Sequence, residues 1–192
     1  MSSINIIPKD AELVFTGIRS RIYQWNQVMY DGSIRRFESI RFTDGAFVLP
    51  ILPDGRILLT RQEQPWRTQF ISLPGWSFDA PTEDPFACAI REFKEETGYT
   101  SDNIIEWGVY YGTNNVHTEV SYFIARDCLK ISEIIGDGWE KIELFTVSFD
   151  EFLELSSNNM FHHHWNLLPI LYEARLFPEK KEALRKIIFG DE

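Results

Sequence analysis

The stretch that most constrains this chain is residues 83–99, which read EDPFACAIREFKEETGY. Asp84 suits the N-cap of a helix, the proline after it suits the first turn, and Gly98 suits the stop. Residues 85–97 are therefore predicted to form one short helix. The side chains expected on its buried side are Phe86, Ala89, Ile90, Phe93 and Thr97.

Three carboxylates are predicted to share another side of this helix. Glu92, Glu95 and Glu96 are neighbours because positions i, i+3 and i+4 lie together. Like charges on adjacent turns repel each other and raise at least one carboxyl pKa. A divalent cation removes that penalty, and Mg²⁺ or Mn²⁺ prefers carboxylate and phosphate oxygens. Because charge runs usually face water, the spacing alone leaves both a metal site and a solvated acidic face open.

The same stretch closely resembles the Nudix box, G-x5-E-x7-R-E-U-x-E-E-x-G-U, in which U is a bulky apolar residue. Glu83 and residues 91–99 fit this motif, and they carry every carboxylate that it requires. One position departs from it, because Ser77 stands where the motif has glycine, while Gly75 lies two residues earlier. On this match the chain is identified as a member of the Nudix hydrolase family.

The chain beyond the box is similar to the ADP-ribose pyrophosphatase branch of that family, with matching patterns at residues 54–62 and 123–127. The resemblance implies an α+β fold: a Nudix α/β/α sandwich with a mixed sheet, preceded by a small N-terminal antiparallel sheet. Residues 1–43 are expected to form the N-terminal β region, which this branch often exchanges across a homodimer. Residues 44–192 are expected to form the Nudix catalytic domain with C-terminal helices.

Hydrophobic alternation and turn residues give the remaining elements. The segment at 63–82 is expected to be the loop that enters the helix at 85–97. Expected strands are 12–15, 21–25, 37–42, 45–52, 56–62, 105–111, 120–126 and 139–147, and expected helices are 150–155, 164–177 and 179–189. The adjacent histidines at 162–164 are expected to mark the exposed start of a helix.

The resemblance also implies roles for site residues. The catalytic set would be Glu92, Glu95, Glu96, Glu140 and Arg91. The metal ligands for Mg²⁺ (or Mn²⁺) would be Glu92, Glu95 and Glu96, with a backbone carbonyl at Gly75 or Trp76. Arg91 is expected to pair with Glu83 and so to fix the loop on the helix. The general base stays open between Glu140 and a helix carboxylate.

The substrate is less constrained because the departures from the branch cluster where a ligand would be held. The motif region reads SLPGW at 72–76, and Asn114 stands where the branch often has proline. Candidate substrate contacts are Gln62, Arg67, Trp76, Asn114 and Trp25, with Trp66 as a further aromatic. ADP-ribose or another nucleotide-sugar is the favoured substrate. A dinucleotide, a non-standard nucleoside triphosphate, or a ligand-binding module without catalysis are the alternatives.

The composition limits the kinds of partner and the cellular compartment that we expect for this chain. A net charge of −10 argues against long nucleic acid as a partner, because phosphate backbones need clustered Lys and Arg. No apolar run approaches the ~20 residues of a membrane span, and the N-terminus lacks a secretory pattern. Two cysteines, Cys88 and Cys128, favour reduced thiols. We therefore expect a cytoplasmic protein. That it acts on a small nucleotide as a homodimer is what the family resemblance implies.

Overall fold

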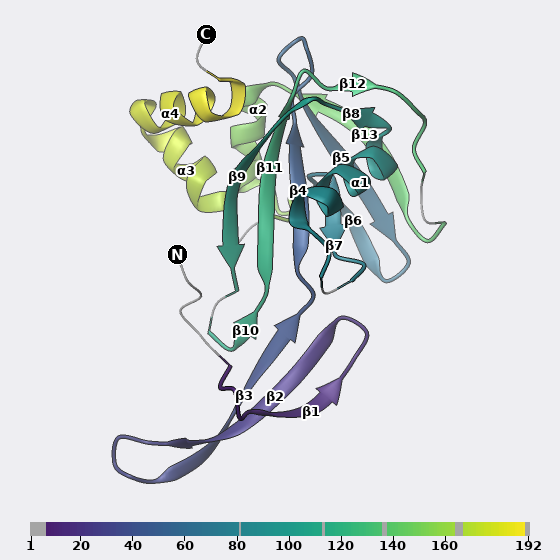
Figure 1. Ribbon diagram of the computed structural model, residues 1–192. Helices are drawn as coiled ribbons and strands as arrows, with labels where there is room; N and C mark the ends of the chain where they lie inside the picture. The colour runs from purple at the N-terminus through teal and green to yellow at the C-terminus, as the bar shows by residue number, and fades with distance from the viewer. Residues whose placement is uncertain (1–6, 81, 113, 136–137, 164–166, 191–192) are drawn as a thin grey trace.

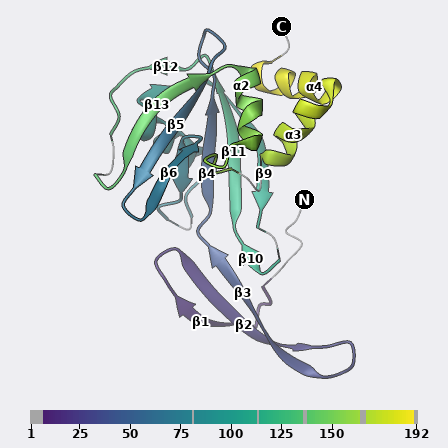
Figure 2. The same ribbon diagram turned by 180° about the vertical axis from the view of Figure 1, so that it is seen from behind.

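The computed structural model describes residues 7–80, 82–112, 114–135, 138–163 and 167–190. Its strands form three main sheets, which Figures 1 and 2 show from opposite sides. The first has the order β1-β2-β3-β10, the second β7-β4-β11-β9 and the third β13-β5-β6, with a short pair β12-β8. This α+β arrangement with mixed sheets is the fold class that the sequence predicted.

The bounds of the elements follow. The strands are β1 Glu12–Thr16, β2 Ser20–Val28, β3 Ile34–Phe42, β4 Gly45–Pro50, β5 Ile57–Gln64, β6 Arg67–Ser72, β7 Gly75–Ser77, β8 Tyr99–Thr100, β9 Asn103–Tyr111, β10 Val116–His117, β11 Glu119–Arg126, β12 Leu129–Lys130 and β13 Lys141–Val147. The helices are α1 Pro85–Thr97, α2 Phe149–Glu154, a 3₁₀ turn Leu155–Ser157, α3 Leu168–Leu176 and α4 Pro178–Phe189.

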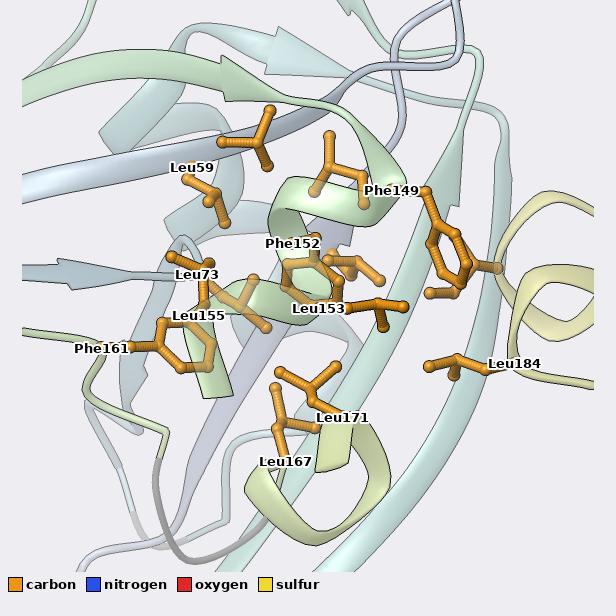
Figure 3. Close-up of a cluster of buried hydrophobic side chains, with 14 of the residues drawn as sticks. Leu59, Leu73, Phe149, Phe152, Leu153, Leu155, Phe161, Leu167, Leu171 and Leu184 are labelled. Atoms are coloured by element: carbon orange, nitrogen blue, oxygen red, sulfur yellow. The ribbon is translucent and has the colours of Figure 1, made fainter. Parts of the chain in front are cut away.

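The sheet β7-β4-β11-β9 has a hydrophobic core on each face. Successive side chains along β4 and β11 point to opposite faces of this sheet, so each strand contributes to both cores. Val48 and Phe123 pack with Ala89 and Phe93 of α1 in the smaller core. The neighbouring positions on these strands, Leu49 and Tyr122 among them, belong to the larger core under α2, α3 and α4. Figure 3 shows this larger core, with Phe149, Phe152 and Leu153 of α2 facing Leu167, Leu171 and Leu184. The helix α1 is thus held against the sheet opposite the C-terminal helices.

The N-terminal sheet lies apart from the two cores at one end of the molecule (Figure 1). Its strands β1, β2 and β3 pair antiparallel, as the sequence predicted. A fourth strand, β10, joins β3 in parallel through Val116 and Ile40, so a segment expected to be loop ties this sheet to the rest of the chain. Sequence periodicity gives no notice of a two-residue strand.

Two further expectations about these elements were wrong. The segment 63–82 is not a single loop, because β6 pairs antiparallel with β5 and β7 pairs with β4. The start of the late helix was also misplaced: α3 begins only at Leu168, and Pro169 lies in its first turn. Residues 164–166, with which that helix was expected to begin, lie outside the described residues. Among the helices described, none is long and apolar enough to cross a membrane.

Candidate active site

The helix α1 has the ends that its sequence predicts. The Asp84 carboxylate accepts a hydrogen bond from the Ala87 N–H at 3.0 Å, and Gly98 adopts φ of 74° while its N–H donates to the Lys94 carbonyl. Ala89 and Phe93 are fully buried, whereas Phe86, expected on the buried side, is 43% exposed. These ends fix the length of the helix and therefore the places of its three glutamates.

Glu96 is the most deeply buried of these glutamates, at 4% exposed. Its Oε2 accepts a hydrogen bond from the Gly75 N–H at 3.1 Å and a longer one from Gln62 Nε2 at 3.4 Å. Burial raises the pKa of Glu96 well above its ordinary range, and the charges of Glu92 and Glu140 raise it further, although the two hydrogen bonds oppose this. The site therefore holds a carboxylate that is costly to ionise without a cation.

Arg91 joins the helix to the preceding loop. Its guanidinium lies 3.2 Å from Glu83 Oε1, as the resemblance implied, and 3.2 Å from Asp79. It also contacts Glu92 at 2.6 Å and Glu95 at 3.2 Å. Arg91 thus balances part of the charge that the acidic residues concentrate here.

Glu92 keeps a raised pKa in spite of this arginine. Burial is the main cause and brings the pKa of Glu92 to about 7, while the hydrogen bond and charge of Arg91 pull it down. Burial thus opposes the ionised form of both Glu92 and Glu96 and raises the pKa of each carboxyl.

The acidic side chains are of the chemical type that binds a divalent cation, but their present positions do not form a metal site. Within the described ranges, no three His, Cys, Asp or Glu side chains are placed to hold a metal ion as they stand. Glu92 and Glu95 are both engaged by Arg91. Nevertheless, buried carboxylate oxygens are the donors that Mg²⁺ and Mn²⁺ prefer, and a cation would relieve the cost of ionising Glu96. The donor set fits a divalent ion.

These residues line one cavity of about 620 Å³. It contains Glu92, Glu95, Glu96, Glu140 and Arg91, all from the predicted catalytic set, together with Trp76. Sequence reasoning missed Trp139, Arg19 and Asp79, which line it too. Trp139 precedes Glu140 in sequence and could have been found from that position, whereas Arg19 arrives only through the tertiary fold. A larger groove between the β4–β5 turn and α4 has mixed charges and none of these residues.

The other predicted substrate contacts lie elsewhere. Gln62 is buried, and its amide supports Glu96 and Thr60. Arg67 lies over the Phe70 ring at 3.8 Å, and Trp25 packs on Phe37 in the N-terminal sheet. Asn114 has a φ of 55° in the turn before β10. Arg67, Trp25 and Asn114 are not part of the acidic cavity.

His163 supports the loop that carries Gly75. Its Nε2 accepts a hydrogen bond from the Leu73 N–H at 3.1 Å, and its Nδ1 lies 2.9 Å from the Tyr122 hydroxyl. At 5% exposed, it contradicts the expectation of a surface helix start. The reason is that residues 160–162 run beside β6, where the Ile71 N–H donates to Met160 and the His162 N–H to Ile71. His164 lies outside the described residues.

The chain is similar in sequence to known proteins. The family model described as NUDIX domain matches residues 41–169. The chain is 24% identical over 146 residues to an ADP-ribose pyrophosphatase from Bacillus subtilis (strain 168), which covers 76% of this chain and 75% of that protein. It is 22% identical over 165 residues to a methanol dehydrogenase activator from Bacillus methanolicus, which covers 84% and 88%.

The fold has a known counterpart as well. A crystal structure of an ADP compounds hydrolase superposes with a TM-score of 0.71 at 19% identity, covering 90% of this chain and 94% of that one. At this identity the similarity shows the fold alone. The family is shown by the matching family model. The chain therefore belongs to the Nudix family of hydrolases, as its acidic helix predicted.

Proposed function

We propose that the chain is a metal-dependent pyrophosphatase that cleaves the pyrophosphate bond of a nucleoside diphosphate linked to another group. The observation that carries this proposal is the gathering of Glu92, Glu95, Glu96 and Glu140 around one cavity beside aromatic side chains. Cleavage of a diphosphate needs its negative charge neutralised and a water directed at phosphorus. Acidic residues alone would repel the substrate, so the proposal requires a cation.

The residues proposed to hold that cation are Glu92, Glu95 and Glu96, with the Gly75 carbonyl as a further oxygen ligand. A bound Mg²⁺ or Mn²⁺ would neutralise the diphosphate and polarise the phosphorus toward attack by water. Nudix hydrolases use divalent ions, and the chain's own part is to present these oxygens in fixed positions. The Gly75 N–H and Gln62 orient the Glu96 carboxylate for this purpose.

The remaining polar groups have separate roles in this proposal. Arg91 holds the loop before α1 against the helix through its ion pair with Glu83. It also balances part of the negative charge of Glu92 and Glu95. Glu140 lines the same cavity as Glu96, and its charge raises the pKa of Glu96, so we place it beside the water that would be activated. The general base is either Glu140 or one of Glu92 and Glu95, and both choices keep the proton within the acidic cavity.

For the substrate we propose ADP-ribose or another nucleotide-sugar, which would give a nucleoside monophosphate and a sugar phosphate. This is supported by the relative named as an ADP-ribose pyrophosphatase. A panel of ADP-ribose, nucleotide-sugars, dinucleotides and non-standard nucleoside triphosphates, each with Mg²⁺ or Mn²⁺, tests it. We expect the highest kcat/KM for a nucleotide-sugar and no turnover with excess chelator. Binding without cleavage under any metal would instead indicate a non-catalytic module.

We also propose that the chain acts as a homodimer joined through the N-terminal sheet. That sheet exposes large apolar side chains, which a monomer would leave in water. They are Leu13, Val14, Phe15, Val28, Ile34, Phe37 and Phe42. Sedimentation at micromolar concentration should give a dimer, and Phe15→Lys should shift the equilibrium toward monomer. A monomer across the whole concentration range would refute this part of the proposal.

A further inference from the structure

The buried His163 joins strand β11 to the bend between β6 and β7. Its Nε2 accepts a hydrogen bond from the Leu73 N–H at 3.1 Å, and its Nδ1 lies 2.9 Å from the Tyr122 hydroxyl. Because a backbone N–H only donates, Nε2 is the unprotonated ring nitrogen, so Nδ1 carries the proton and donates to Tyr122. The imidazole is therefore neutral, and each of its two nitrogens has a defined partner.

The bend consists of residues 73–75, and each of them is bonded to a different part of the fold. The three bonds run from the Leu73 N–H to His163, from the Val48 N–H of β4 to the Pro74 carbonyl, and from the Gly75 N–H to Glu96. The strand β6 ends before Leu73, and β7 begins only at Gly75. The Leu73 N–H is thus bonded by a side chain in place of a neighbouring strand.

Packing alone does not require a histidine at this position. The ring centroids of Phe47 and Phe161 lie 4.6 Å and 5.4 Å from that of His163, so an apolar ring would suit these neighbours. A phenyl ring would also avoid the cost of taking two ring nitrogens out of water. However, Leu73 is fully buried, so its N–H is shielded from water and needs an acceptor. The imidazole supplies this acceptor, which an apolar side chain cannot do.

We propose that His163 is a positioning residue for the cation site and that it acts through the bend. This inference rests on the proposed function of the acidic cavity, because it concerns the backbone of Gly75. The Gly75 N–H bonds Glu96, and the Gly75 carbonyl is the proposed oxygen ligand. His163 is not among the residues that line the cavity. It holds the bend so that both backbone groups of Gly75 keep their places, and Tyr122 fixes the orientation of the imidazole.

The inference is tested by binding of Mn²⁺ alone to the full-length chain, measured from the electron paramagnetic resonance signal of the free ion. The variant His163→Phe keeps a ring and removes the acceptor, whereas His163→Gln can present a side-chain oxygen to the Leu73 N–H. Tyr122→Phe removes only the hydroxyl that orients the imidazole. Leu184→Val is the matched control, because Leu184 is buried in the same core but lies across it from Leu73 (Figure 3).

We expect His163→Phe to weaken Mn²⁺ binding by about 10- to 100-fold, the usual loss when a residue that orients a metal ligand is replaced. The kcat for the best substrate of the panel should fall in the same variant. His163→Gln should restore most of the affinity, and Tyr122→Phe should lose part of it. Leu184→Val should lower the melting temperature and leave the Mn²⁺ affinity unchanged. A purely structural role of His163 would instead make the affinity follow the melting temperature in all variants.

Wild-type Mn²⁺ affinity in folded His163→Phe would overturn the inference, and so would equal losses in His163→Phe and His163→Gln. If His163→Phe does not fold, Tyr122→Phe decides, and an unchanged affinity in that variant would overturn the inference as well. These results leave the proposed function in place as long as the wild type binds Mn²⁺ and cleaves a compound of the panel. A wild type that does neither would remove the proposed function, and the positioning role with it.

Discussion

Replacing Glu96 with glutamine should lower kcat by at least about 10³-fold in the presence of Mg²⁺, which corresponds to about 4 kcal/mol of lost transition-state stabilisation. Glu96 is proposed to supply a charged oxygen to the cation, and a neutral amide of the same shape provides far less attraction. The loss should appear mainly in kcat, since the groups that contact the rest of the substrate are unchanged. Steady-state kinetics at saturating Mg²⁺ gives this result directly.

The fold of Glu96→Gln should remain intact. The glutamine oxygen can still accept the hydrogen bond from the Gly75 N–H, and the cost of burying an ionised carboxylate disappears. The matched control is Glu133→Gln, because Glu133 is an exposed residue that contacts only Lys130 among the described ion pairs. The control should keep wild-type activity. Undiminished turnover in Glu96→Gln would refute the assignment of Glu96 to the metal site.

Replacing Gly75 with alanine should destabilise the fold by at least about 3 kcal/mol, since both backbone strain and overpacking oppose the change. Gly75 has a φ of 133°, in the region that favours glycine. A Cβ atom there would overlap the Ala46 carbonyl oxygen and lie 2.7 Å from the Phe47 Cα, both on strand β4. Because the clash is with backbone, no side-chain movement can relieve it.

A second glycine gives the comparison that separates strain from crowding. Gly55 also has a positive φ, of 78°, but a Cβ atom there meets nothing within 4 Å. Gly55→Ala should therefore cost only roughly 1 kcal/mol. Chemical denaturation of both variants measures the difference. Equal losses in the two would mean that the close approach of β7 to β4 does not matter for stability.

The local features of the site could be predicted from sequence because they depend on near neighbours. Asp84 and Gly98 mark the ends of α1 by side-chain capping and by the conformational freedom of glycine, and both ends are confirmed. Glu92 and Glu96 lie together because of helical spacing. The pairing of Arg91 with Glu83 followed from the motif and is present in the structure.

The features that the sequence analysis mispredicted or missed depend on contacts between segments that are distant in sequence. The strand β6 is stabilised by pairing with β5 and by residues 160–162, and its own sequence does not carry that information. His163 reads as polar and exposed, but three buried partners satisfy it. Arg19 and Trp139 line the same cavity although they lie far apart in the sequence. Sequence alone shows the chemical type of such residues, but it does not show which residues surround them in the fold.

The central claim is that the acidic side of α1 binds a divalent cation against a diphosphate. The most direct measurement is a crystal structure of the chain with Mg²⁺ and a non-hydrolysable ADP-ribose analogue. The account predicts an ion held by Glu92, Glu95 and Glu96 and bridged to the diphosphate oxygens. An ion bound elsewhere, with these three side chains turned to solvent, would contradict it.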